Sequence, residues 1–160
     1  MMAPKDAKWQ AGLADLLRAA TRDPNATLIL DDTLESPTDG YITLSAEFSG
    51  PSHPLVTVRA SLSGVEQEAI VLHEAAHWRL GHVSNEAYRA AASADAAASL
   101  DAARAPFERE ANEHALTTLL SEAAVLSQLG SPKAAVRDAL LEGCCALGGA
   151  ASDPPPSGAS

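Results

Sequence analysis

The sequence contains few aromatic residues and few cysteines. Aromatic residues make up 4% of the 160 residues, whereas apolar residues make up 46%, many of them alanine. Because alanine favours helix but buries little surface per residue, we expect a helix-rich fold with a modest core. The two cysteines, Cys144 and Cys145, are adjacent, and no CxxC pair exists. This usage argues against a disulfide framework and against a thiolate zinc site.

The sequence also lacks basic clusters and long apolar segments. Its formal net charge is −10, and no group of lysines and arginines forms a positive patch. Such a surface repels phosphate groups, so we expect no direct binding to nucleic acid or membrane. No apolar run has the length of a membrane span, and residues 1–10 are polar and charged. A cytoplasmic protein is therefore expected.

The predicted secondary structure is mainly helical. Apolar spacing, together with capping and stop signals, predicts helices over residues 8–20, 63–80, 106–129 and 132–147. Ser63 and Glu66 match a capping box for the second helix, and Pro106 fits the first turn of the third. The alanine-rich residues 84–105 are either a helix packed by small side chains or a mobile connection.

Three β-prone runs precede the helix 63–80, over residues 27–30, 41–48 and 55–62. Strands in this order suggest a small meander, and hence a mainly antiparallel sheet packed on that helix. The predicted fold class is α+β, with one helix-rich domain over residues 1–147. Residues 148–160 are rich in Gly, Pro and Ser, and we expect them to form a disordered tail.

The helix 63–80 carries the pattern HEAAH over residues 73–77. His73 and His77 leave one helix face a turn apart, so both imidazoles can bind one Zn²⁺. Glu74 is placed to act as general base on a water that the metal activates. The alternative is a pair of surface histidines on an ordinary amphipathic helix. An apolar stripe beside the histidines argues against it, formed by Ala69, Leu72, Ala76 and Leu80.

A catalytic zinc usually has three protein ligands, so a third must come from another element. The candidates lie together on the helix after Pro106, namely Glu108, Glu110, Glu113 and His114. Phe107, Ala111, Ala115 and Leu119 define the predicted buried face of this helix. Glu110 lies on or beside that face and is the favoured ligand, with His114 as its competitor. Glu108 and Glu113 are expected to be solvated surface.

Two stretches resemble the signatures of the ImmA/IrrE-type zinc metallopeptidases. Residues 69–82 read AIVLHEAAHWRLGH, which is similar to the zinc-helix signature of that family. Residues 107–115 read FEREANEHA and resemble its second signature, E-x-E-A-N-x-F-A. Two differences stand out: His114 replaces the usual Phe, and Ser121-Glu122 replaces the usual Met-Pro pair. We therefore expect the helix to continue past that point.

The resemblance implies a gluzincin-like, zincin-type domain with Zn²⁺ held by His73, His77 and Glu110 and with Glu74 as general base. It also implies that the strand over residues 55–60 is the sheet edge beside the cleft, where an extended substrate could add as a further strand. The expected function is that of an endopeptidase acting on a protein or peptide.

The resemblance further implies that the substrate is a helix-turn-helix transcriptional regulator. It would be a separate partner, because this sequence has no basic helix-turn-helix segment. Two alternatives stay open. One is a non-catalytic zinc module that binds and sequesters a regulator, and the other is a helical scaffold without metal.

Overall fold

The structure is a computed structural model, and it describes residues 4–34, 39–45, 52–85, 97–122 and 129–151. In chain order the elements are α1 (Pro4–Thr21), β1 (Thr27–Asp31), β2 (Gly40–Ser45), β3 (His53–Arg59), α2 (Gly64–Arg79), the 3₁₀ turn η1 (His82–Ser84), α4 (Ala97–His114), the π-helical η2 (Ala115–Leu119), α5 (Leu120–Glu122) and α7 (Lys133–Ala151). The predicted α+β, helix-rich class is confirmed. No helix among these residues is long and apolar enough to cross a bilayer.

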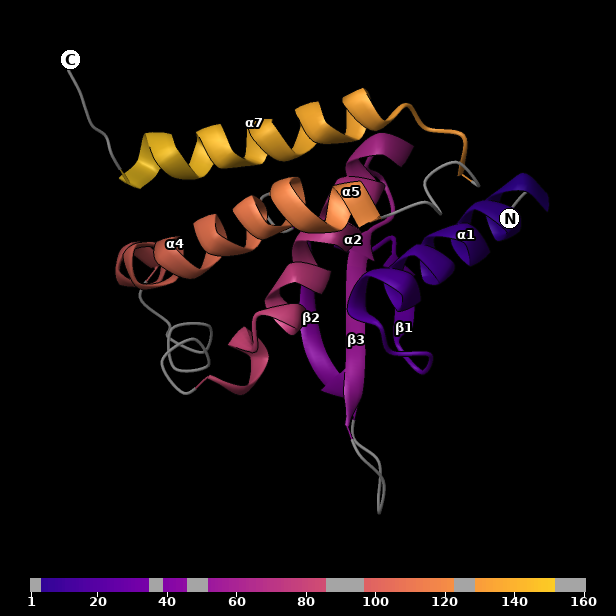
Figure 1. Cartoon of the computed structure of the whole chain (residues 1–160), viewed down its shortest axis with the longest axis horizontal. Coiled ribbons are helices and arrows are strands. Elements are labelled where there is room, and N and C mark those ends of the chain that lie inside the picture. Colours follow the sequence, from indigo (N-terminus) through magenta and orange to yellow (C-terminus); the bar gives the residue numbers. More distant parts are fainter. Residues whose placement is uncertain (1–3, 35–38, 46–51, 86–96, 123–128, 152–160) are drawn as a thin grey trace.

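The central element is α2. It contacts β2 and β3 on one side and α4 and α7 on the other, and it also packs against α1. Figure 1 shows this arrangement, with α4 and α7 stacked on the side of α2 that faces away from the strands. A helix with neighbours all round can carry buried polar groups, provided that those neighbours supply hydrogen-bond partners.

The sheet is mixed rather than a meander. The strand order is β1-β3-β2, with β3 parallel to β1 and antiparallel to β2. The prediction that the strand over residues 55–60 forms the sheet edge is therefore wrong. Val56 and Val58 are buried in the core, and Thr57 on the other face is buried between its strand neighbours Ile29 and Tyr41, which are themselves exposed. The edge strand that contacts η1 is β2.

The start and end of α2 follow their sequence signals. Ser63 Oγ accepts a hydrogen bond from the Glu66 backbone N–H at 3.2 Å, and the Glu66 carboxylate accepts one from the Ser63 N–H at 3.1 Å. This confirms the capping box. Gly81 follows the helix with φ 78°, a left-handed conformation that favours glycine. The chain therefore turns sharply and enters η1 directly.

The later helices differ from the prediction in their bounds. Pro106 lies inside α4, which begins at Ala97, so its predicted place in a first turn is wrong. The alanine-rich residues before Pro106 extend the helix toward the N-terminus. After His114 the chain continues through η2 and α5 to Glu122, so the expected continuation is confirmed. Helix α7 runs to Ala151, beyond the predicted boundary at residue 147, and residues 152–160 lie outside the described part of the chain.

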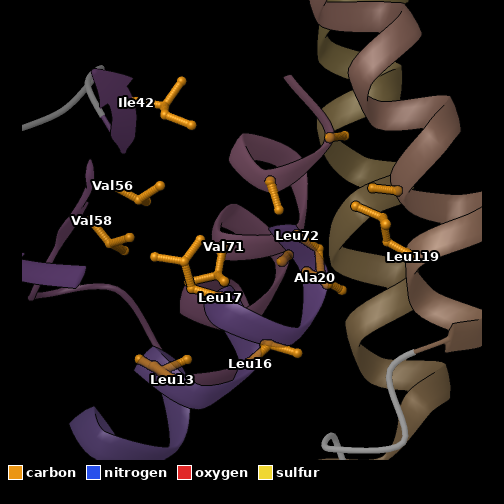
Figure 2. Close-up of a cluster of buried hydrophobic side chains, with 14 of the residues drawn as sticks. Leu13, Leu16, Leu17, Ala20, Ile42, Val56, Val58, Val71, Leu72 and Leu119 are labelled. Atoms are coloured by element: carbon orange, nitrogen blue, oxygen red, sulfur yellow. The ribbon is translucent and has the colours of Figure 1, made fainter. Parts of the chain in front are cut away.

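The core combines leucines from α1 with small residues on the central helices. Figure 2 shows Leu13, Leu16 and Leu17 of α1 in the same cluster as Val71 and Leu72 of α2. Several fully buried residues of the helices are alanines: Ala75 and Ala76 on α2, Ala111 on α4 and Ala115 in η2. Small side chains allow helix axes to approach closely, and this brings the polar residues of α2 and α4 within reach of each other.

Helix α2 also carries a buried acid, Glu68, which lies outside the group of residues around its two histidines. Glu68 is fully buried, and the Ser131 hydroxyl donates a hydrogen bond to its Oε2 atom. Its Oε1 atom has no hydrogen-bond partner among the described residues. Burial raises the pKa of the Glu68 carboxyl above its ordinary value, and the Ser131 bond only partly opposes this shift.

The raised pKa predicts how stability changes with pH. Because the folded state holds the Glu68 proton more tightly than the unfolded chain, the free energy of unfolding should fall as pH rises from 4.5 through the raised pKa. Glu68→Gln should remove this slope, whereas Glu113→Gln, on the exposed face of α4, should retain it. Urea unfolding at several pH values measures the effect. An unchanged slope in Glu68→Gln would contradict this interpretation.

Candidate metal centre

Three side chains from two helices meet at one point. The Nε2 atom of His73 lies 2.7 Å from Glu108 Oε1, and the Nε2 atom of His77 lies 3.2 Å from the same oxygen. The histidines come from adjacent turns of α2 and the glutamate comes from α4. One donor atom from each residue lies within 4.8 Å of the other two. These three residues, His73, His77 and Glu108, are called the His₂Glu cluster below.

The His₂Glu cluster is largely shielded from water. The side chain of His77 is 1% exposed, and those of His73 and Glu108 are 12% and 13% exposed. The two imidazole rings meet edge to face, with centroids 4.9 Å apart. A buried carboxylate is costly unless a positive charge or hydrogen bonds compensate it. Its surroundings must therefore supply positive charge.

The pKa values of His73 and Glu108 are shifted in the directions that keep His73 positively charged and Glu108 negatively charged. Burial alone would lower the pKa of His73, but the hydrogen bond to Glu108 and the negative charge of Glu74 raise it to about 9. Burial alone would raise the pKa of Glu108, but hydrogen bonds from His73 and His77 hold it well below its usual range. In the metal-free chain, a proton on His73 therefore supplies the positive charge that a bound cation would supply.

The second nitrogen of each histidine is also bonded. His73 Nδ1 lies 2.7 Å from Asn112 Oδ1, and His77 Nδ1 lies 2.9 Å from His82 Nδ1. Asn112 in turn donates from Nδ2 to the Leu140 carbonyl of α7 at 2.8 Å, which fixes the orientation of its amide. With both Nδ1 atoms used in this way, the Nε2 atoms are the ones directed at the shared point. Metal-binding histidines typically have such outer partners.

The third member of the cluster differs from the residue predicted. Glu110 was favoured, but its carboxylate lies 2.6 Å from His82 Nε2 and its side chain is 59% exposed. The structure instead brings Glu108 to the histidines, although Glu108 was expected to be solvated surface. The buried face of α4 includes Ala111 and Asn112, and Glu108 lies one turn before Asn112. The signal in the sequence was the helical phase: at about 100° per residue, Glu108 lies within the predicted apolar stripe from Phe107 to Leu119, whereas Glu110 lies about 200° round the helix from Glu108.

The other predicted residues lie as follows. Glu74 is buried beside the cluster, and its negative charge is one of the causes that raise the pKa of His73. Glu113 is exposed, as expected. His114 is half-buried and is not part of the cluster, and its Nε2 atom has no hydrogen-bond partner among the described residues. Burial and the positive charge of Arg79 lower the pKa of His114.

The donor set fits a zinc ion. Zn²⁺ binds imidazole nitrogen and carboxylate oxygen readily, and a catalytic zinc takes three protein ligands and leaves one position open. The His₂Glu cluster offers that number and those types of ligand. Because a protein group must lose its proton to bind a metal, binding here would replace the proton on His73 by the ion.

Comparisons with protein-family models, with curated proteins and with solved structures gave no match for this chain. The resemblance to the ImmA/IrrE-type metallopeptidases therefore rests on the two sequence signatures alone and stays a prediction.

Metal binding should depend on pH in a defined direction. Because the pKa of His73 is about 9, Zn²⁺ must displace its proton at neutral pH. The apparent affinity should rise about tenfold per pH unit between pH 6 and pH 8 for a one-proton exchange. Calorimetry in buffers of different ionisation enthalpy measures the protons released. Binding without proton release at pH 7 would contradict a protonated His73.

Proposed function

We propose that this chain is a zinc-dependent endopeptidase of the ImmA/IrrE type, with a zincin-like arrangement of its active site. The observation that carries the proposal is the convergence of His73, His77 and Glu108 beside Glu74. A general base next to two ligands on one helix is typical of metallopeptidases with the HExxH pattern. The complete HExxH pattern supports a catalytic role over a purely structural one, because a structural site does not need Glu74.

The members of the His₂Glu cluster would hold the metal ion. When bound, Zn²⁺ supplies Lewis acidity that activates a water molecule and polarises the scissile carbonyl. The cluster lies where α2 and α4 meet and is mostly shielded from solvent. Low exposure strengthens electrostatic interactions within the site. The protein thus contributes a fixed and dry arrangement of charges around the reacting groups.

Glu74 would move the proton. Its carboxylate takes one proton from the attacking water as the oxygen forms a bond to the carbonyl carbon. It then delivers that proton to the leaving amine as the carbon–nitrogen bond breaks, so no further acid is required. Since Glu74 is buried, its carboxylate is held in place by the surrounding helices, which favours such a positioned proton transfer.

The proposed substrate is a protein, and specifically a helix-turn-helix transcriptional regulator encoded separately. The support for this choice is the sequence resemblance to the family. A separate substrate is also consistent with the composition of the chain, because its net charge of −10 does not suit a role on DNA. The regulator, rather than this chain, would then contact the nucleic acid.

Glu74→Gln tests the proposal. The variant should bind Zn²⁺ as the wild type does but should lose at least about a hundredfold in kcat/KM, because its amide cannot accept the proton. Used as bait, it should retain the substrate, which mass spectrometry identifies and which the wild-type chain then cleaves. Glu113→Gln, an exposed acid on α4, provides the matched control.

Two outcomes would contradict the proposal. Cleavage by Glu74→Gln at the wild-type rate would exclude Glu74 as the base. If Glu74→Gln controls a captured regulator as well as the wild type does and neither protein cleaves it, the chain is a sequestering module rather than a peptidase.

A further inference from the structure

A line of hydrogen bonds leads outward from the His₂Glu cluster. His77 Nδ1 lies 2.9 Å from His82 Nδ1, and His82 Nε2 lies 2.6 Å from Glu110 Oε1. His77 and His82 are both buried, whereas the Glu110 side chain is 59% exposed. The line therefore connects a candidate metal ligand to a carboxylate at the protein surface.

The chemistry of imidazole fixes the direction of these bonds when a metal is bound. A metal at His77 Nε2 needs the lone pair there, so the ring proton of His77 must be on Nδ1. His77 Nδ1–H then donates to His82 Nδ1, which must be an acceptor. The remaining proton of His82 is consequently on Nε2, and it is donated to Glu110. Only this assignment gives every bond in the line one donor and one acceptor.

The opposite assignment would work against metal binding. If the proton of His82 were on Nδ1, it would point at His77 Nδ1. His77 could accept it only by carrying its own proton on Nε2, the atom that must bind the metal. An acceptor at His82 Nε2 prevents this, because it keeps the His82 proton on the outer side of the ring. Glu110 is that acceptor.

The fold holds His82 in this position. The left-handed Gly81 turns the chain back toward α2, so His82 follows the helix end directly. The ring of Phe107 meets the His82 ring edge to face, with centroids 5.1 Å apart. Glu110 lies on the same helix as Phe107 and Glu108. One segment of α4 therefore supplies a ligand to the His₂Glu cluster, a packing partner for His82 and the acceptor for its outer nitrogen.

We infer that His82 and Glu110 are positioning residues, which hold His77 in the tautomer and orientation that direct its Nε2 atom at the metal. The inference rests on the metal-binding part of the proposed function. It gives Glu110 a role two hydrogen bonds outside the ligand set, through His82. The two histidines would then be oriented in different ways. The buried amide of Asn112 orients His73, whereas a line of hydrogen bonds that ends on a charged surface residue orients His77.

Three variants test the inference. Glu110→Ala removes the acceptor, whereas Glu110→Gln keeps an oxygen acceptor on a side chain of the same length. Glu113→Ala removes a nearby exposed acid from the same helix. Zn²⁺ affinity is measured by competition with a chromophoric chelator, and thermal unfolding of the metal-free proteins checks the fold. Glu110→Ala should bind Zn²⁺ up to about 10-fold more weakly, at the lower end of the effect of direct outer partners, because Glu110 acts on His77 through His82. Glu110→Gln should recover most of that affinity, and Glu113→Ala should match the wild type.

A spectroscopic signature separates positioning from a general loss of structure. In the zinc-loaded wild type, ¹⁵N–¹H correlation spectra of the histidine rings should show His77 with its proton on Nδ1 and His82 with its proton on Nε2. In the metal-free wild type, Glu110 should keep the His82 proton on Nε2. In metal-free Glu110→Ala the His82 signals should change to a mixture of tautomers, because neither a bound metal nor the Glu110 acceptor then fixes the proton. A merely structural role for Glu110 would lower the unfolding temperature without changing these signals.

The outcomes distinguish this inference from the proposed function. Wild-type affinity in Glu110→Ala, or an equal loss in Glu110→Gln and Glu110→Ala, would overturn the inference. If the wild type binds Zn²⁺ and the variants behave as expected but no peptide bond is cleaved, the inference stands and the peptidase proposal fails. A wild-type chain that takes up no Zn²⁺ contradicts both.

Discussion

The contact on which the site depends is the Glu108 carboxylate shared between His73 and His77. It joins α4 to the centre of α2, and in the metal-free chain it is an ion pair within a largely dry interface. Such a pair contributes little to stability by itself, because desolvation offsets much of its Coulomb energy. In the proposed function, a divalent cation would supply the positive charge that this buried carboxylate requires and that a proton on His73 supplies in the metal-free chain.

The rest of the fold places these three side chains together. Small residues on the facing surfaces, such as Ala76 and Ala111, allow α2 and α4 to lie close to each other. Many of the larger apolar side chains of the core lie between α1, α2 and the sheet, while Leu119 of η2 lies among the later helices (Figure 2). The alanine-rich composition thus has a structural consequence, because bulkier residues between the two helices would separate Glu108 from the histidines. Helix α7 completes the arrangement through its bond to Asn112.

Local signals in the sequence predicted the elements better than their arrangement. The Ser63 capping box, Gly81 and the spacing of His73 and His77 all depend on nearby residues, and they predicted α2 and two members of the cluster. The sheet order depends on which strands meet in space, so the central place of β3 was missed.

Glu108 and Glu110 show a different kind of error at the site. They are about 200° apart on an ideal helix, and Glu108 lies within the predicted apolar stripe of α4, so the helical phase favoured Glu108 and the choice of Glu110 misjudged it. The sequence did not show the polar partners of these residues, Asn112 and His82, which come together only in the folded chain. The most direct test is a crystal structure of the protein purified without an affinity tag and loaded with Zn²⁺, with anomalous data at the zinc edge. We expect one zinc peak at roughly 2.0–2.2 Å from a donor atom of each residue of the His₂Glu cluster, with Glu110 bonded to His82. No zinc at this point, or zinc bound by Glu110 in place of Glu108, would contradict the account.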